Sequence, residues 1–151
     1  MKQVMSKELK HYNYLHSELE AVYHNMAFNL GLSDSTMRIL YTLCNNEYRC
    51  RLQDICLLSG ISKQTVNSAI RKLEAMNIVY LENIGAKSKL VCLTESGISL
   101  AKQTALKMIE AENSVFADWS ERDIKRYLDL TERFLNEFKE KSKLAYAKKQ
   151  E

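Results

Sequence analysis

The polar and basic side chains between residues 62 and 72 are the part of this sequence best suited to recognising another molecule. The amides of Gln64 and Asn67 can pair with the edge of a DNA base, and the guanidinium of Arg71 can pair with guanine or with a phosphate. Hydroxyls and lysines are typical phosphate ligands. The predicted DNA contacts are Ser62, Lys63, Gln64, Thr65, Asn67, Ser68, Arg71 and Lys72, with Lys87 and Lys89 further along the chain.

Three of these residues have an equally good structural interpretation. Ser62 and Thr65 stand where a hydroxyl commonly caps the start of a helix. Lys72 stands near a helix end, where a cation interacts favourably with the exposed carbonyls. For these three residues, helix stabilisation and DNA contact are both open alternatives.

Two short helices are predicted to position this polar run. Residues 52–58 form the first helix, residues 59–62 a turn, and residues 63–76 the second helix. The buried face of the second helix repeats at helical spacing and consists of Val66, Ile70 and Leu73. The polar run therefore lies on the outer face. This order is typical of a helix-turn-helix, whose second helix enters a DNA major groove.

A β-hairpin is predicted directly after the second helix. Asn77 ends that helix at a position that favours positive φ. Residues 78–84 are rich in β-branched and aromatic side chains, residues 85–88 form a turn, and residues 89–93 return as the second strand. A hairpin in this position makes the unit a winged helix and places Lys87 and Lys89 on the wing.

Long amphipathic helices are predicted at both ends of the chain. An apolar stripe from Leu9 to Leu30 predicts one N-terminal helix, ended by Gly31, and Ser33 or Asp34 caps the next helix. Two further helices close the chain. The first is capped by Thr94 and has apolar positions up to Trp119, and the second begins at Ser120. These stripes exceed what one small central unit can cover, which favours packing against a second copy of the chain.

The predicted fold class is therefore mainly α with a small β-hairpin wing. A winged helix-turn-helix core is flanked by long N- and C-terminal dimerisation helices. The expected organisation is an N-terminal dimerisation helix at residues 1–32, a DNA-binding unit at residues 33–95, and C-terminal dimerisation helices at residues 96–151.

Composition is consistent with this class. The chain has 151 residues, 46% of them hydrophobic and 27% charged, which is ordinary for a globular protein. Proline is absent and the net charge is only +3. Between Gly60 and Cys92, however, five basic residues stand against two acidic ones, so positive charge is concentrated where phosphate contact would need it.

Several classes of protein are not expected from these residues. The sequence has no Gly-rich phosphate loop or nucleophile motif, so we expect no enzyme activity and no cofactor. The spacing of the three histidines, all in the first helix, does not make a close metal-binding pair. With no secretory or membrane-spanning segment expected, we predict a cytoplasmic protein with reduced thiols and no membrane partner.

The pattern resembles the MarR family of bacterial transcriptional regulators over nearly the whole chain. The matching stretches are residues 61–66 entering the second helix, residues 71–74 leaving it, and residues 93–97 after the wing. The resemblance implies a homodimer that binds near-palindromic double-stranded DNA, acting as a repressor released by a small-molecule effector.

The chain departs from the family pattern on the wing and at two other positions. An Asp and an Arg, separated by one residue, are usual on the wing, and Gly85 and Lys87 stand in their places. Lysine lacks the rigid fork of arginine. The family often has Gly where Asn77 stands and a basic residue where Ser68 stands, so base preference can differ here.

The resemblance also implies a cleft for a small aromatic or apolar effector between the dimer helices and the DNA-binding unit. Candidate lining residues are His16, Tyr23, His24, Met37 and Tyr41, for which ordinary packing is the competing interpretation. A thiol-based redox sensor is one alternative function, with Cys50 between Arg49 and Arg51 as the thiol whose pKa could be lowered. The other alternative is a winged-helix protein-interaction module without DNA binding.

Overall fold

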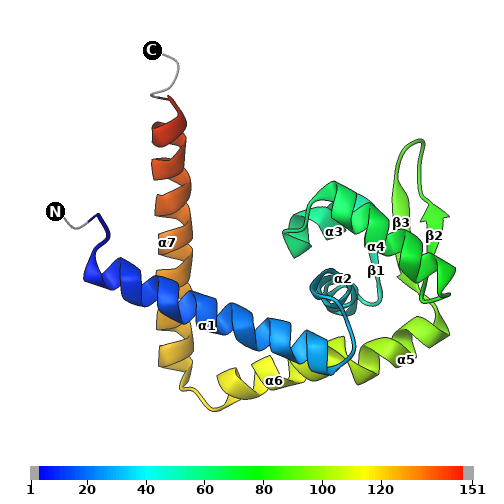
Figure 1. Cartoon of the computed structure of the whole chain (residues 1–151), viewed down its shortest axis with the longest axis horizontal. Helices are drawn as coiled ribbons and strands as arrows, with labels where there is room; N and C mark the ends of the chain where they lie inside the picture. The colour runs from blue at the N-terminus through cyan, green and yellow to red at the C-terminus, as the bar shows by residue number, and fades with distance from the viewer. Residues whose placement is uncertain (1–3, 148–151) are drawn as a thin grey trace. The chain divides into compact units, whose positions relative to one another are not determined.

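The structure, a computed structural model, describes residues 4–147 and is mostly helical with one small sheet (Figure 1). The chain divides into two compact units, Met1–Glu110 and Ala111–Glu151, which are described separately. The predicted mainly helical chain with a hairpin is confirmed. The elements are α1 (Lys7–Asn29), α2 (Asp34–Asn45), β1 (Arg49–Arg51), α3 (Leu52–Ser59), α4 (Lys63–Ala75), β2 (Val79–Asn83), β3 (Lys89–Leu93), α5 (Glu95–Gln103), α6 (Ala105–Ala117) and α7 (Glu121–Ala147).

The core of the first unit lies where α2 meets the helix-turn-helix and the sheet. Ile39, Leu40 and Leu43 from α2 are fully buried, as are Ile55 from α3 and Val66 from α4. Burial of each such side chain contributes about 1.5–3 kcal/mol. The predicted inner face of the second helix is confirmed, and it fixes which side of α4 points outward.

The helix boundaries follow the predicted capping residues. The hydroxyls of Ser33, Ser62 and Thr94 each accept a hydrogen bond from the backbone N–H three residues later, and so cap α2, α4 and α5. Asn77 has the predicted positive φ, at 57°, and Gly31 after α1 has a φ of 79°. These residues satisfy groups that a helix end leaves unpaired.

The sheet contains a third strand that the sequence analysis missed. The strand order is β1-β3-β2, and β1 pairs antiparallel with β3, so that Arg49 lies opposite Cys92 and Arg51 opposite Leu90. Glu47 and Tyr48 have positive φ values of 55° and 67° and turn the chain from α2 into β1. A strand of three residues is too short for periodicity to reveal.

One predicted continuous helix is broken into α5 and α6. The backbone of Thr104 has φ −130° and ψ −87°, outside the helical region. Its hydroxyl donates a hydrogen bond to the carbonyl of Leu100 at 2.7 Å, and its own carbonyl accepts from the N–H of Lys107 at 3.0 Å. Thr42 and Thr131 make the same hydroxyl bond inside the continuous helices α2 and α7, so the backbone conformation of Thr104, and not its hydroxyl bond alone, marks the break.

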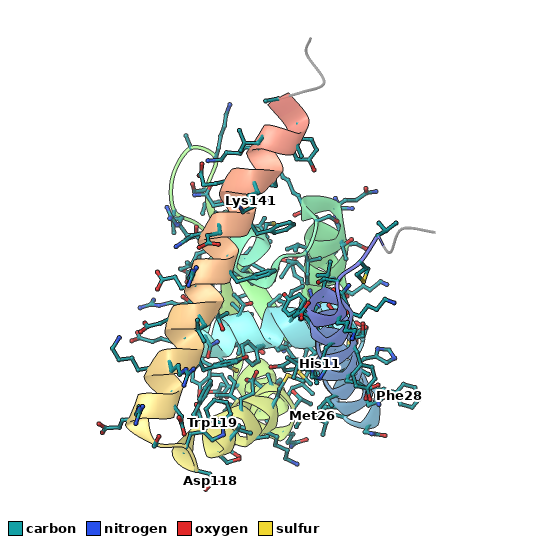
Figure 2. All side chains as sticks on the ribbon, turned by 90° about the vertical axis from the view of Figure 1, so that its left-hand side faces the viewer. His11, Met26, Phe28, Asp118, Trp119 and Lys141 are labelled. Atoms are coloured by element: carbon teal, nitrogen blue, oxygen red, sulfur yellow. The ribbon has the colours of Figure 1, made fainter. Side chains whose placement is uncertain are left out.

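The second unit is organised around the connection between α6 and α7, where Figure 2 shows Trp119. The rings of Phe116 and Tyr127 meet Trp119 nearly edge to face, each with a centroid distance of 5.5 Å. The hydroxyl of Ser120 accepts the N–H of Asp123 at 3.1 Å, as predicted for the start of the last helix. No residue of α7 is buried in the single chain.

Candidate nucleic-acid interface

α3, a tight turn and α4 form the predicted helix-turn-helix (Figure 1). Gly60 ends α3 in the left-handed conformation, with φ 68° and ψ 13°. A side chain would be strained at this φ, so glycine allows the sharp change of direction. The turn then leads into the capped first residue of α4.

The outer face of α4 presents a row of side chains that point away from the core. Gln64, Ser68 and Arg71 follow one another at spacings of four and three residues, opposite the buried face of the helix, and all three are exposed. Among the residues that the structure describes, none forms a side-chain hydrogen bond or ion pair with Gln64 or Arg71. Their amide and guanidinium groups are therefore available to a ligand.

The flanks of this row are less uniform than the sequence suggested. Asn67 is only half-exposed, because it lies closer to the buried face. Ser62 has the capping role, since its hydroxyl accepts the Thr65 N–H at 3.3 Å and donates to the Thr65 hydroxyl at 2.9 Å. Thr65 keeps its own hydroxyl proton for another acceptor.

Four of the predicted DNA contacts are lysines on α4 and on the wing. Lys63 and Lys72 are exposed on α4, Lys87 lies in the loop of the wing, and Lys89 begins β3 opposite Asn83. The loop is closed by a hydrogen bond from the Ile84 N–H to the Ser88 carbonyl at 3.1 Å. Within residues 4–147 none of these lysines has an acidic partner, and α4 has no acidic residue in its first turn. Such unpaired cations favour a polyanion.

The structure shows packing or pairing contacts for several of the candidate effector residues. The His24 imidazole Nδ1 lies 2.9 Å from the Asp34 carboxylate and links α1 to α2. His16 stacks on Tyr12 with a centroid distance of 5.8 Å. Met37 is a core residue, only 2% exposed. Tyr41 packs against the core, and Tyr23 is partly exposed on α1.

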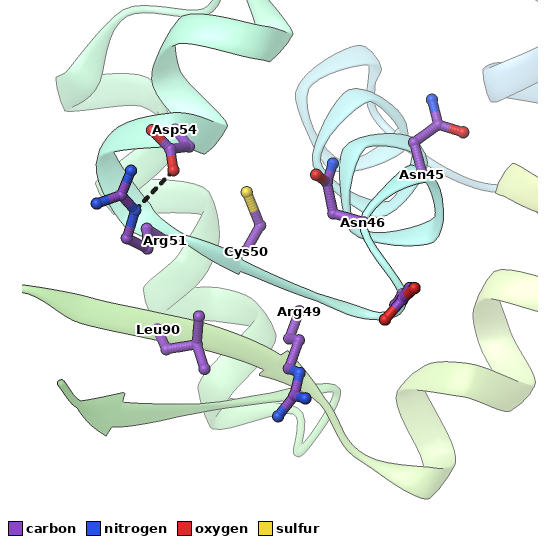
Figure 3. Close-up of a pocket in the computed structure, with 8 residues that line it drawn as sticks. Asn45, Asn46, Arg49, Cys50, Arg51, Asp54 and Leu90 are labelled. Atoms are coloured by element: carbon purple, nitrogen blue, oxygen red, sulfur yellow. Dashed lines mark hydrogen bonds and ion pairs between the residues drawn. The ribbon is translucent and has the colours of Figure 1, made fainter.

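A different, open groove of about 490 Å³ lies beside β1 (Figure 3). Its lining includes Asn46, Arg51, Cys50 and Asp54. The Arg51 guanidinium is held by the Asp54 carboxylate at 2.8 Å. The groove therefore carries one ion pair, and the charged side chains of Glu47 and Arg49 also line it.

The prediction of a lowered pKa for Cys50 was wrong. Burial raises the pKa of the Cys50 thiol, the Asp54 carboxylate raises it further, and Arg51 opposes them more weakly. The side chain is only 6% exposed. Burial also raises the pKa of Cys44 to about 11. Both thiols are therefore held in the unreactive protonated form.

Two further features of the described residues bear on the excluded classes. No group of three or more His, Cys, Asp or Glu side chains in residues 4–147 could hold a metal ion. No helix in the same range has the length and apolar character needed to cross a membrane.

Comparison with known proteins places this geometry in context. The sequence model of the MarR family matches residues 30–86, from the end of α1 to the wing loop. A search of curated proteins finds no match. The chain is similar in structure to NMB1585, a MarR family regulator from Neisseria meningitidis, with a TM-score of 0.76, 22% identity, and coverage of 91% of this chain and 96% of that one.

Two other solved structures are informative because of what they contain. Sco3205, a MarR family transcriptional regulator from Streptomyces coelicolor in complex with DNA, has a TM-score of 0.66 and 16% identity, covering 89% of this chain and 90% of that one. NadR in complex with 4-hydroxyphenylacetate has a TM-score of 0.68 and 14% identity, covering 89% of this chain and 96% of that one. At these identities the likeness shows a shared fold.

Proposed function

With the resemblance to the MarR family confirmed by the match over residues 30–86, we propose that this chain is a dimeric, sequence-specific DNA-binding transcriptional regulator rather than an enzyme. One observation carries the proposal. The outward row of Gln64, Ser68 and Arg71 is exposed on the second helix of a helix-turn-helix. DNA binding would place the protein in the cytoplasm.

The row matches the chemistry of a major groove. Gln64 can pair with the N6 and N7 atoms of adenine, and Arg71 with the O6 and N7 atoms of guanine. Each such bidentate pair discriminates against a wrong base by about 1–3 kcal/mol. Ser68 would contact a base edge or a bridging water, and the flanking Thr65 and lysines would contact phosphates.

Dimerisation is supported by apolar faces that the single chain leaves exposed. On α1, Leu15, Leu19 and Val22 are 53%, 48% and 61% exposed, and on α7, Leu135 and Phe138 are 49% and 62% exposed. Apolar faces that remain exposed along a helix in this way mark an interaction surface. A second copy would cover them and set two α4 helices about 34–36 Å apart, so the operator would be a near-palindrome.

We further propose that the protein represses transcription and that a small aromatic or apolar molecule releases it. The complex of NadR with 4-hydroxyphenylacetate supports this class of effector. The effector would act by favouring a dimer whose reading helices no longer match the operator spacing.

The alternative functions are less well supported by the geometry. A protein-interaction module would favour an apolar or acidic outer face on α4, whereas this face is polar and basic. A redox sensor would need an accessible thiolate, whereas burial raises the pKa values of Cys44 and Cys50.

The test is fluorescence anisotropy on DNA from upstream of the protein's own gene, or on a site obtained by random-sequence selection. We expect saturable binding of one dimer per palindrome that weakens steeply with salt and survives competition by random DNA. The double variant Gln64→Ala, Arg71→Ala should lose at least about a thousandfold in affinity, from two lost base contacts in each of two half-sites. Binding that random DNA competes away would overturn the proposal.

The chain offers a matched control for this double variant. Lys102 and Gln103 are exposed on α5, away from α4. Replacing both by alanine removes one positive charge and one glutamine, as the Gln64→Ala, Arg71→Ala variant does. We expect this control to keep full affinity. Equal losses in the two double variants would attribute the effect to net charge and remove Gln64 and Arg71 from base recognition.

A further inference from the structure

The start of α5 is hydrogen-bonded to the segment that follows the reading helix α4. The donor, Thr94, and the acceptor, Asn77, are 17 residues apart in the sequence. The Thr94 hydroxyl lies 2.6 Å from the Asn77 carbonyl and 3.1 Å from the Ile78 carbonyl. The Thr94 N–H donates to the Ile78 carbonyl at 3.0 Å. We call Asn77, Ile78, Thr94 and Gly97 the wing clamp.

The same hydroxyl also caps α5. Its oxygen accepts the Gly97 N–H at 2.9 Å, while its single proton is donated toward Asn77. The sequence predicts only the capping role. The second hydrogen bond joins the base of the wing, where β2 begins, to the point where β3 has ended.

On the other side, the clamp continues into α4. The Asn77 N–H donates to the Glu74 carbonyl at 3.0 Å, and the Ile78 N–H donates to the Leu73 carbonyl at 2.8 Å. This pair of bonds is the Schellman arrangement that ends a helix, and Asn77 has the required positive φ. Asn77 and Ile78, which follow α4 directly in the chain, therefore join its last turn to the start of α5 by hydrogen bonds to Thr94.

Gly97 shows how closely these elements approach. A Cβ atom at this position would lie 2.0 Å from the Ile78 carbonyl oxygen and 3.1 Å from its carbonyl carbon. Only glycine allows this approach without displacing α5 or β2. The contact confirms that the hydrogen bonds of the clamp act over a closely packed joint.

We propose that Thr94 is a positioning residue that fixes the wing relative to the reading helix, so that Lys87 and the row on α4 engage DNA together. The inference rests on the proposed DNA-binding function and deepens it. Without the hydroxyl bond to Asn77, the β2–β3 pairing and the Thr94 N–H bond to Ile78 persist, but the end of β3 is held less firmly against the exit of α4. The wing then samples orientations in which its lysines miss the phosphates.

Two substitutions separate clamping from capping. Thr94→Ser keeps both roles. Thr94→Asp keeps the cap, because aspartate is among the best N-cap residues, but a carboxylate cannot donate to the Asn77 carbonyl and repels it. Ser96→Asp is the control for added charge, since Ser96 is exposed in the same turn of α5.

The first readout is independent of DNA. Hydrogen exchange of the backbone amides in residues 77–93 should be faster by about tenfold in Thr94→Asp, equivalent to the loss of about one hydrogen bond. Thr94→Ser and Ser96→Asp should exchange as the wild type does. Exchange in α2 should be the same in all variants, which excludes global destabilisation.

The second readout is the effect of Lys87→Ala on operator affinity, measured in the wild-type protein and in Thr94→Asp. In the wild-type background, Lys87→Ala should weaken binding by about tenfold, from one phosphate contact on each of two wings. In Thr94→Asp, which has already lost those contacts, Lys87→Ala should have almost no effect. Gln64→Ala should weaken binding by the same factor in both backgrounds, because α4 stays in place.

The outcomes separate the two proposals. If wild-type protein binds no DNA specifically, the proposed function fails, and hydrogen exchange still decides whether Thr94 holds the wing. Wild-type exchange rates in Thr94→Asp would overturn the clamp. The clamp would also be overturned if Lys87→Ala and Thr94→Asp had independent, multiplicative effects on affinity.

Discussion

Replacing Gly97 by alanine tests the packing at the base of the wing. Alanine is favoured over glycine inside a helix by about 1 kcal/mol, so at an ordinary position of α5 the change would stabilise the protein. Here the new Cβ would lie 2.0 Å from the Ile78 carbonyl oxygen, whereas real Cβ atoms essentially never approach another atom within 3.0 Å. The two groups must therefore separate by about 1 Å.

The magnitude follows from what that separation disrupts. It lengthens the hydrogen bonds that Thr94 makes to Asn77, at 2.6 Å, and to Ile78, at 3.0 Å. Their loss costs about 1 kcal/mol each. Displacing neighbours such as Leu93, 3.1 Å from the same Cβ, adds the roughly 1–3 kcal/mol typical of an inserted methyl group. After the gain in helix propensity, the free energy of unfolding should fall by about 2–4 kcal/mol.

The assay is urea denaturation followed by circular dichroism at a fixed protein concentration, since a dimer's stability depends on concentration. Ser99→Ala is the matched control, because Ser99 is exposed in the same helix and gains only helix propensity. We expect Gly97→Ala to unfold at lower urea than the wild type and Ser99→Ala at equal or higher urea. A Gly97→Ala variant as stable as the wild type would refute the close approach between α5 and the Ile78 carbonyl.

Three further perturbations test separate parts of the structure. Ser62→Ala should lower the free energy of unfolding by about 1 kcal/mol, since it removes the cap of α4, whereas Ser68→Ala should not lower it; urea titration that finds the two equal would contradict the capping role. Phe138→Asp should shift the protein toward monomer in sedimentation equilibrium, and Asn136→Asp, on the opposite face of α7, should not; a dimer that survives Phe138→Asp would exclude this face from the interface. Burial raises the pKa of Cys44 from 9.0 to about 11, so the thiol ionises in the unfolded chain at a lower pH than in the folded protein, and the free energy of unfolding should fall between pH 9 and pH 11. The fall should be smaller in Cys44→Ala, and parallel pH profiles of wild type and variant would contradict the raised pKa of Cys44.

Much of the helix-turn-helix and wing could be predicted from the sequence because the signals are local. A capping serine acts on an amide three residues away, as Ser62 does on Thr65. The inner face of α4 repeats within two turns, so the opposite placement of Gln64 and Arg71 follows from helix geometry alone. The positive φ of Asn77 likewise reflects a preference of the residue at a helix end.

The wrong predictions concern residues at which local signals compete with one another, or whose properties depend on their surroundings in the folded chain. Arg49 and Arg51 flank Cys50 in sequence, which suggested a lowered pKa. In the folded chain, however, Arg51 binds Asp54 and burial of the thiol is the larger effect. At Thr104, apolar periodicity favoured a continuous helix, but the backbone there leaves the helical region, with φ −130° and ψ −87°.

The sequence by itself determined the order of helices and strands, the caps, and the polar face of α4, because these depend on residues within one or two turns of each other. Only the tertiary structure decided the third strand, the protonated state of Cys50, and the wing clamp. Arg49 pairs with Cys92, and Thr94 reaches Asn77, across long stretches of chain. Such contacts form only when folding brings distant segments together, and their hydrogen bonds depend on a geometry that no local pattern encodes.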